Sequence, residues 1–409
     1  MGNFTSVDQM DDFFGNGEEV SQRVLYGPGA SERIGETAKD LGQSVLLVTD
    51  QGLSAAGHPQ KVREDLERAG LQVTLFDKSI ENPTEASVQT CVQVAKSEKV
   101  DMIVGLGGGS SMDTAKGCNF ILTNGGRMAD YWGVGKATRA MLPLIALPTT
   151  AGTGSECQSI ALISEDNTHR KMACGDKKAL PRITILDPKL TLSQPRMVTA
   201  CTGIDALTHA LESAVTTKRN DRSDRHSLMA FELIHENLPQ VFERPDDLDA
   251  RGAVLLGASH AGAAIERSML GAAHSMANPL TARRGTVHGV AVGLALPAVM
   301  EFNAGHPETK VRYADLARRA GLVTSDSSET DSVEALLARV RHLLSLANFP
   351  SSLSELGFEE ADLSGLAKSA SEQWTAGFNP RPIETHEFLR LYSSLFNPTP
   401  CLGERQGLS

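Results

Sequence analysis

The chain has 409 residues, of which 41% are hydrophobic and 22% are charged, so it holds enough apolar residues for two globular domains and is not generally disordered. Its net charge of −11, without a dense cluster of lysine and arginine, argues against nucleic acid or a membrane surface as a partner. The six scattered cysteines include no CxxC pair, which is typical of reduced thiols in a cytoplasmic protein. We expect neither a signal peptide nor a membrane span.

The first half of the chain alternates short apolar runs with helical patterns. Strands are predicted at 44–50, 71–77, 100–109 and 141–150, and helices at 58–70 and 84–98. This alternation predicts an α/β fold with a doubly wound parallel sheet. The later pattern is helical almost throughout, for example over 225–241, 248–270, 290–303 and 333–347. We therefore predict an α/β dinucleotide-binding domain over residues 1–190 and an all-helical domain over residues 191–409.

A glycine-rich turn follows the strand predicted at 100–109, in the stretch VGLGGGSSMDTAKG. Gly107, Gly108 and Gly109 have no Cβ, so the backbone can approach a ligand closely, and the next helix points free N–H groups at the turn. Strand, turn and helix in this order favour a pyrophosphate site over an ordinary tight turn. The stretch is not the standard GxGxxG fingerprint, because Ser110 stands where a glycine is needed.

Two further loops follow predicted strands. Asp50 ends the strand 44–50, where a carboxylate can accept hydrogen bonds from a ribose diol and would repel a 2′-phosphate, which favours NAD over NADP. A solvated turn aspartate is the alternative. The stretch LPTTAGTGSE at 147–156 offers the hydroxyls of Thr149 and Thr150 and close backbone approach at Gly152 and Gly154. Taken alone, ordinary turn chemistry explains that stretch better.

The stretch GIDALTHALES places Asp205 and His209 four residues apart, on one face of a predicted helix. A buried ion pair, a metal site and a catalytic acid/base pair all explain this spacing. His274 and His288 follow in the helical half, and one carboxylate with three imidazoles suits a divalent ion such as Fe²⁺ or Zn²⁺. A four-ligand set leaves room for a substrate on an ion that takes five or six ligands, which favours catalysis.

The ordered motifs GGGSSMDTAK, PTTAGTGSE, GIDALTHALES and GAAHSMANPL…VHG resemble the signatures of the iron-containing (group III) alcohol dehydrogenases over nearly the whole chain. The resemblance implies a nucleotide-binding domain and a helical domain with the active site between them. It implies metal-assisted catalysis by Fe²⁺, with Zn²⁺ or another divalent ion as alternatives, on the ligands Asp205, His209, His274 and His288. The cofactor contacts that it implies are Asp50, Gly107, Gly108, Gly109, Ser110, Asp113, Thr149, Thr150 and Lys171.

One position departs from the pattern of this family. Many relatives carry a histidine that relays a proton four residues after the third ligand, and this chain has Asn278 there. An amide cannot titrate, so the proton leaves through water and the cofactor ribose, or another group such as His260 accepts it.

The resulting prediction is a metal-dependent oxidoreductase that transfers a hydride between an alcohol, or its aldehyde or ketone, and NAD(P). We expect a homo-oligomer, a dimer or larger, on the strength of the resemblance. The alternatives are another member of the fold, such as a polyol dehydrogenase or a maleylacetate reductase-like enzyme, and a catalytically silent nucleotide-binding protein.

Overall fold

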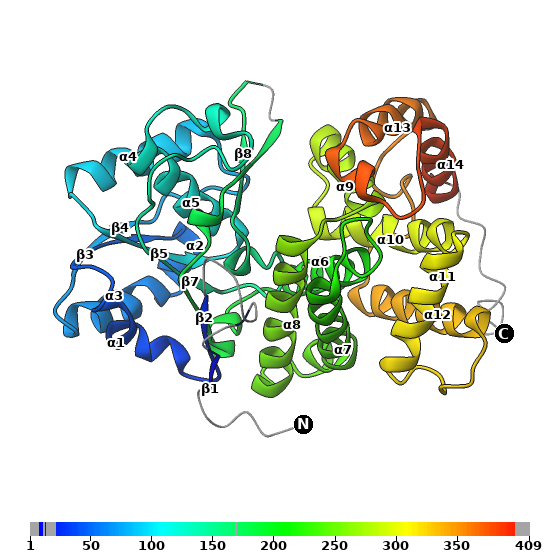
Figure 1. Ribbon diagram of the computed structural model, residues 1–409, viewed down its shortest axis with the longest axis horizontal. Helices are drawn as coiled ribbons and strands as arrows, with labels where there is room; N and C mark the ends of the chain where they lie inside the picture. Colours follow the sequence, from blue (N-terminus) through cyan, green and yellow to red (C-terminus); the bar gives the residue numbers. More distant parts are fainter. Residues whose placement is uncertain (1–7, 11–12, 14–21, 168–169, 397–409) are drawn as a thin grey trace.

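The computed structural model describes residues 8–10, 13, 22–167 and 170–396, and it places a sheet-containing part beside a helical part (Figure 1). The larger sheet has the strand order β1-β2-β10-β7-β5-β3-β4. Its strands are β1 (Asp8–Met10), β2 (Arg23–Tyr26), β3 (Ser44–Val48), β4 (Gln72–Phe76), β5 (Met102–Gly107), β7 (Leu144–Pro148) and β10 (Ile183–Leu186). All of the pairs are parallel except that of β1 with β2.

Helices cover both faces of this sheet, which is why its central strands are apolar along their whole length. In β3, Leu46 and Val48 pack into a core with α4 (Glu85–Ser97) and α5 (Gly109–Asn124). Val45 and Leu47 point to the opposite face, toward α1 (Ile34–Ala38) and α3 (His58–Arg68). Every residue of β5 is buried. Burial on both faces is the arrangement expected for a doubly wound parallel sheet.

A second, smaller sheet has the order β6-β9-β8 and was not predicted from the sequence. It consists of β6 (Gly133–Val134), β8 (Ile160–Ser164) and β9 (Lys171–Gly175). The sequence analysis also missed β1, β2 and β10. Four of these strands, β1, β2, β6 and β10, have only two to four residues, which is too few for a period of two to be recognised.

The helical part is built around α6 (Arg196–Ser213), against which α7 (Asp221–Glu243), α8 (Leu248–Arg267) and α10 (His288–Ala304) pack. The remaining helices of eight or more residues are α9 (Ala272–Arg284), α11 (Pro307–Arg319), α12 (Glu329–Ala347), α13 (Leu363–Ser371) and α14 (Thr385–Phe396). α6 is buried on nearly all sides from Gly203 to Ser213. Among the described residues, no helix is both long enough and apolar enough to cross a membrane.

The predicted fold class is confirmed: a parallel sheet with helices on both faces precedes an all-helical region. The division at residues 190 and 191 stays a prediction. It falls at the end of the 3₁₀ turn η5 (Pro188–Thr191), after β10 and before α6. In Figure 1, α6 and α8 lie at the centre of the molecule, on the side of the helical part that faces the sheet.

Candidate metal and nucleotide site

Three loops that the sequence analysis singled out follow adjacent strands. β7, β5 and β3 are neighbours in the sheet and run parallel, so their carboxyl ends meet at one edge. The loop after β3 holds Asp50, the loop after β5 is the glycine turn, and the loop after β7 begins with Thr149. Ligands of open α/β sheets bind at this edge. The structure therefore brings the predicted cofactor residues of these three loops to one place.

The glycine turn is tight against its surroundings. Gly107 has a φ of +148°, and a Cβ there would lie 2.6 Å from Oγ of Ser111. A Cβ at Gly109 would lie 2.8 Å from Cγ2 of Thr153, in the loop after β7. Helix α5 begins at Gly109, so its first N–H groups, including that of Ser110, open toward the edge of the sheet. This is the arrangement that accepts a phosphate at a helix N-terminus.

Asp50 lies at the carboxyl edge of the sheet, as predicted, and its side chain also caps a helix. Its Oδ1 accepts a hydrogen bond from the backbone N–H of Leu53 at 3.0 Å and so caps helix α2 (Gln51–Ala55). Its Oδ2 lies 3.4 Å from Oγ of Ser111, at the start of α5. The carboxylate therefore stands between the loop after β3 and the phosphate turn.

The close approach expected at Gly152 and Gly154 is made to the protein itself. A Cβ at Gly152 would lie 2.5 Å from Cβ of Thr202 on α6, and one at Gly154 would lie 2.5 Å from Cα of Gly262 on α8. These two glycines let the loop after β7 contact helices α6 and α8. The loop thus fixes the edge of the sheet relative to the helix that carries Asp205.

Asp113 lies inside the protein rather than at the surface of the glycine turn. Its Oδ1 accepts a hydrogen bond from Oγ of Ser155 at 3.2 Å. Burial raises the pKa of Asp113 to about 6, although the neighbouring ammonium of Lys116 opposes the shift. Lys116 is fully buried and donates to the carbonyls of Ser155 and Ile160, at 2.6 and 3.0 Å. The pair therefore holds the loop after β7 in place.

The small sheet presents an apolar face that includes Val134 and Leu162, which are 76% and 39% exposed. A Cβ at Gly175 would lie 3.2 Å from Ile160 and 3.5 Å from Val134, so these positions share one face. Lys171 lies on the same face, four residues before Gly175 on β9. Desolvation by the protein lowers its pKa, while the carboxylates of Asp113 and Asp205 oppose the shift. Lys171 is therefore within electrostatic reach of the helical part.

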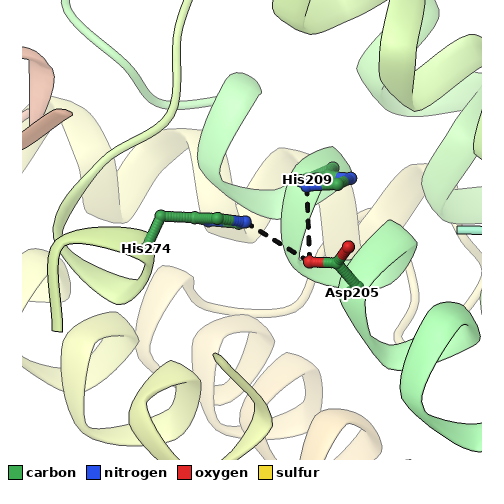
Figure 2. A group of neighbouring side chains, drawn as sticks. All are labelled: Asp205, His209 and His274. Atoms are coloured by element: carbon green, nitrogen blue, oxygen red, sulfur yellow. Dashed lines mark ion pairs between the residues drawn. The ribbon is translucent and has the colours of Figure 1, made fainter. Parts of the chain in front are cut away.

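The four predicted ligands come together around one oxygen atom. Oδ1 of Asp205 lies 3.4 Å from Nε2 of His209, 3.4 Å from Nε2 of His274 and 3.7 Å from Nε2 of His288. Ligand atoms of Asp205, His209 and His274 all lie within 4.8 Å of one another, and these side chains point toward a common centre (Figure 2). Donors bound to one ion at about 2.0–2.2 Å are separated by roughly 3–3.5 Å, so the cluster has nearly that spacing.

Three helices supply these side chains. Asp205 and His209 are one turn apart on α6, His274 lies in the first turn of α9, and His288 is the first residue of α10. Helix α10 reaches α6 because residue 289 is a glycine: a Cβ there would lie 2.2 Å from the carbonyl oxygen of Cys201. Gly289 thus holds His288 against the turn of α6 that precedes Asp205.

The chemistry of this cluster fits a divalent cation. Oδ1 of Asp205 and Nε2 of His274 are buried, and neither has a hydrogen-bond partner within the described part of the chain. A buried polar atom without a partner costs free energy, so such atoms mark a place where something else binds. Burial raises the pKa of Asp205, but the three imidazoles outweigh burial and hold the carboxyl group well below its usual range. The carboxylate is thus ionised, as a ligand must be.

The sequence analysis missed Glu212, although the residue belongs to the quoted stretch GIDALTHALES. Its Oε2 lies 2.6 Å from Nδ1 of His274, on the far side of the ring from Asp205. The signal was the spacing, because Asp205, His209 and Glu212 at i, i+4 and i+7 share one face of α6.

Comparisons with known proteins agree with the fold. The profile described as iron-containing alcohol dehydrogenase matches residues 21–188, and that described as the C-terminal region of the Fe-containing alcohol dehydrogenase family matches residues 199–396. The chain belongs to the iron-containing alcohol dehydrogenase family. It is an oxidoreductase of the NAD(P)-dependent alcohol dehydrogenase type, and the resemblance stated from the motifs is confirmed.

Individual relatives of this family are similar over nearly the whole chain. An NAD-dependent methanol dehydrogenase of Bacillus methanolicus is 35% identical over 90% of this chain and 96% of that protein. A 1,3-propanediol dehydrogenase of Citrobacter freundii is 34% identical over 91% of this chain and 96% of that protein. A crystal structure of a 1,3-propanediol oxidoreductase superposes with a TM-score of 0.88 at 32% identity, covering 96% of this chain and 100% of the other.

Asn278 and His260, the two residues considered for proton transfer in this alcohol dehydrogenase, differ from each other in their contacts and burial. Asn278 is half-buried one helical turn after His274, and its Nδ2 donates to Oε1 of Gln373 at 3.0 Å. His260 is buried on α8, where its Nδ1 lies 2.8 Å from Nδ1 of His226 and its ring stacks on Phe13. Burial lowers the pKa of His260 to about 3, and His226 adds to the shift. A catalytic role for His260 stays an untested prediction, and these contacts favour a packing role.

Proposed function

We propose that the chain is an NAD-dependent dehydrogenase that uses Fe²⁺, held by Asp205, His209, His274 and His288, to interconvert a small alcohol and its aldehyde or ketone. The observation that carries this proposal is the convergence of three imidazole Nε2 atoms on one buried, unpartnered carboxylate oxygen. Three neutral nitrogen donors and one carboxylate suit iron and zinc alike, so Zn²⁺ or another divalent ion is the alternative. The name of the family favours iron.

When bound, the ion supplies a Lewis acid that lowers the pKa of a substrate hydroxyl. The residues of this chain orient the reactants around it. The turn from Gly107 to Gly109, with the N–H of Ser110 and the N-terminus of α5, is suited to the pyrophosphate, and Thr149 and Thr150 flank it on the neighbouring loop. The apolar face of β6, β8 and β9 is suited to the uncharged side of a nicotinamide ring, with Lys171 beside the ribose.

The substrate proton has no titratable acceptor at position 278. The Asn278 amide neither gains nor loses a proton near neutral pH, and His260 is buried against His226. We therefore propose that the proton leaves through water and the ribose hydroxyls of the cofactor. In this proposal Asn278 is a polar, uncharged residue beside the substrate, and its hydrogen bond to Gln373 fixes the orientation of its side chain.

Location and assembly are also proposals. A cytoplasmic location is supported by the five cysteines in the described part of the chain, which are buried free thiols. A homo-oligomer, a dimer or larger, is supported only by the family resemblance.

Asp50→Asn tests the proposed preference for NAD. The amide oxygen still caps α2, whereas the charge that would accept the ribose diol and repel a 2′-phosphate is gone. A hydrogen bond to a charged group is worth about 1.5–3 kcal/mol, so we expect kcat/KM for NAD to fall about 10- to 100-fold relative to that for NADP. Asp247→Asn, at the N-cap of α8, is the matched control. An unchanged ratio of the two cofactors would remove Asp50 from the nucleotide site.

Oxidation of alcohols by the iron-loaded protein tests the function itself. Anaerobic protein reconstituted with Fe²⁺ is mixed with NAD or NADP and a panel of short alcohols, diols and hydroxy acids, and NADH formation is followed by near-ultraviolet absorbance. We expect turnover that a chelator abolishes, with NAD preferred. No turnover with any alcohol and either cofactor, in protein that carries its full complement of iron, would favour another reaction of the fold or a silent nucleotide-binding protein.

A further inference from the structure

Glu212 is a buried carboxylate whose hydrogen bonds both run to helix α9. The side chain is only 4% exposed. Its Oε1 accepts from the backbone N–H of Ala273 at 2.7 Å, and its Oε2 lies 2.6 Å from Nδ1 of His274. Within the described chain, no lysine or arginine forms a salt bridge with it. Because a buried carboxylate is costly unless its oxygens are well paired, these two contacts have to satisfy the whole group.

The contact with His274 determines which ring nitrogen carries the proton. An ionised carboxylate only accepts hydrogen bonds, so Nδ1 of His274 is the donor. A neutral imidazole has one N–H and one lone pair, and Nε2 is therefore left with the lone pair. This is the nitrogen that lies 3.4 Å from Oδ1 of Asp205 and has no hydrogen-bond partner. Glu212 thus leaves Nε2 of His274 as the nitrogen that binds an ion when the ring is neutral.

The contact with Ala273 fixes the helix that carries His274. Helix α9 has Gly271 at its N-cap, which offers no side chain to accept from the first turn. Glu212 and Asn379 do so instead, accepting from Ala273 at 2.7 Å and from Ala272 at 3.3 Å. A Cβ at position 271 would lie 3.1 Å from Oε1 of Glu212 and 3.0 Å from Oδ1 of Asn379. The beginning of α9 is therefore held close to α6.

We propose that Glu212 is a positioning residue of the metal site, which sets metal affinity by fixing the tautomer and the orientation of His274. The inference rests on the proposed function, because it presupposes that the four-residue cluster holds an ion. Carboxylates that accept from a ligating histidine orient the ring and make it a stronger donor. Asp205, His209 and Glu212 then form one continuous face of α6, with two ligands followed by the residue that orients the third.

Glu212→Gln is the variant that separates this role from packing, because the two side chains have nearly the same size. The amide has one acceptor oxygen and one NH₂ group, so it cannot accept from both Ala273 and His274. Either its NH₂ faces Nδ1 and moves the ring proton to Nε2, or its NH₂ opposes the N–H of Ala273. The first arrangement blocks the ligand nitrogen, and the second loosens α9.

The measurement is the dissociation constant for Zn²⁺, obtained by competition with a chromophoric chelator, together with the melting temperature of the metal-free protein. We expect Glu212→Gln to weaken Zn²⁺ binding about 10- to 100-fold and to lower the metal-free melting temperature by no more than Asn379→Ala does. Asn379→Ala is the matched control, because it removes the neighbouring bond to the first turn of α9 and touches no metal ligand. We expect Asn379→Ala to lower the melting temperature and to bind Zn²⁺ within about threefold of wild type.

Two results would overturn the inference. One is a Zn²⁺ affinity of Glu212→Gln within about twofold of wild type, and the other is an equal loss of affinity in Glu212→Gln and Asn379→Ala, which would reduce Glu212 to a packing contact. Failure of the proposed function looks different: the wild-type protein itself would then bind no Zn²⁺ at the cluster.

Discussion

Replacing Asp205 by asparagine removes metal binding and turnover together. Its Oδ1 is the atom on which the Nε2 atoms of His209, His274 and His288 converge, at 3.4 to 3.7 Å. The amide keeps the size of the side chain and loses the one negative charge among the four ligands. We expect Zn²⁺ and Fe²⁺ affinity to fall by more than about 100-fold, and kcat/KM for an alcohol to fall by about 10³-fold or more, since Lewis-acid activation is worth several kcal/mol.

Metal content after dialysis and the rate of NADH formation check this result. Asp224→Asn is the control, because Asp224 lies on α7 in the same helical part and forms ion pairs with Arg219 and Arg312. The control is expected to keep its metal and its rate. An Asp205→Asn protein with full metal occupancy and an unchanged rate would show that the ligand set is wrong.

Gly289→Ala is expected to disrupt the metal site indirectly, by a clash with the backbone of α6. The new Cβ would lie 2.2 Å from the carbonyl oxygen of Cys201, which belongs to helix α6 and cannot rotate away. Helix α10 therefore moves outward and takes His288, its first residue, away from Asp205. Overpacking of this kind costs about 1–3 kcal/mol, which corresponds to roughly 2–4 °C of melting temperature per kcal/mol in a large domain. We expect a lower melting temperature and a loss of metal affinity of about 10-fold or more.

Gly365→Ala is the matched control for this substitution. Gly365 is also inside a helix, α13, and a Cβ there meets only the end of the Arg283 side chain, at 3.4 Å. Alanine is favoured over glycine inside a helix by about 1 kcal/mol, so the control is expected to be neutral or slightly stabilised. If Gly289→Ala behaves like Gly365→Ala in both melting temperature and Zn²⁺ affinity, then the contact between α10 and α6 does not hold His288.

Sequence reasoning predicted best where the residue pattern is local. The run VLLVTD predicted β3 and the position of Asp50, because a strand buried on both faces is continuously apolar and a polar residue marks its end. In the same way, Asp205 and His209 share a face of one helix, so their side chains converge whatever surrounds them. His274 and His288 come from two other helices, so the sequence offered them only as residue types that suit a divalent ion, and the family resemblance then implied them as ligands.

The sequence was less informative about contacts between distant segments. Gly152 and Gly154 were noted as places of close backbone approach in a stretch that turn chemistry explained better, and the segments that approach them are α6 and α8. The reason is that a glycine in the sequence indicates a close approach to the backbone, but it does not identify whether a ligand or another segment of the chain makes that approach. Glu212 was overlooked for a similar reason: its partners, Ala273 and His274, are more than 60 residues away along the chain.

Titration of metal-free protein with Fe²⁺, with the rate of NAD reduction as the readout, tests the central claim most directly. The protein is first stripped with a chelator under anaerobic conditions and assayed with NAD and an excess of a short alcohol. If the cluster around Asp205 is the catalytic metal site, the rate rises from near zero, saturates at about one ion per chain, and returns to zero when the chelator is added again. A full rate in the stripped protein, with no response to Fe²⁺ or Zn²⁺, would contradict the account.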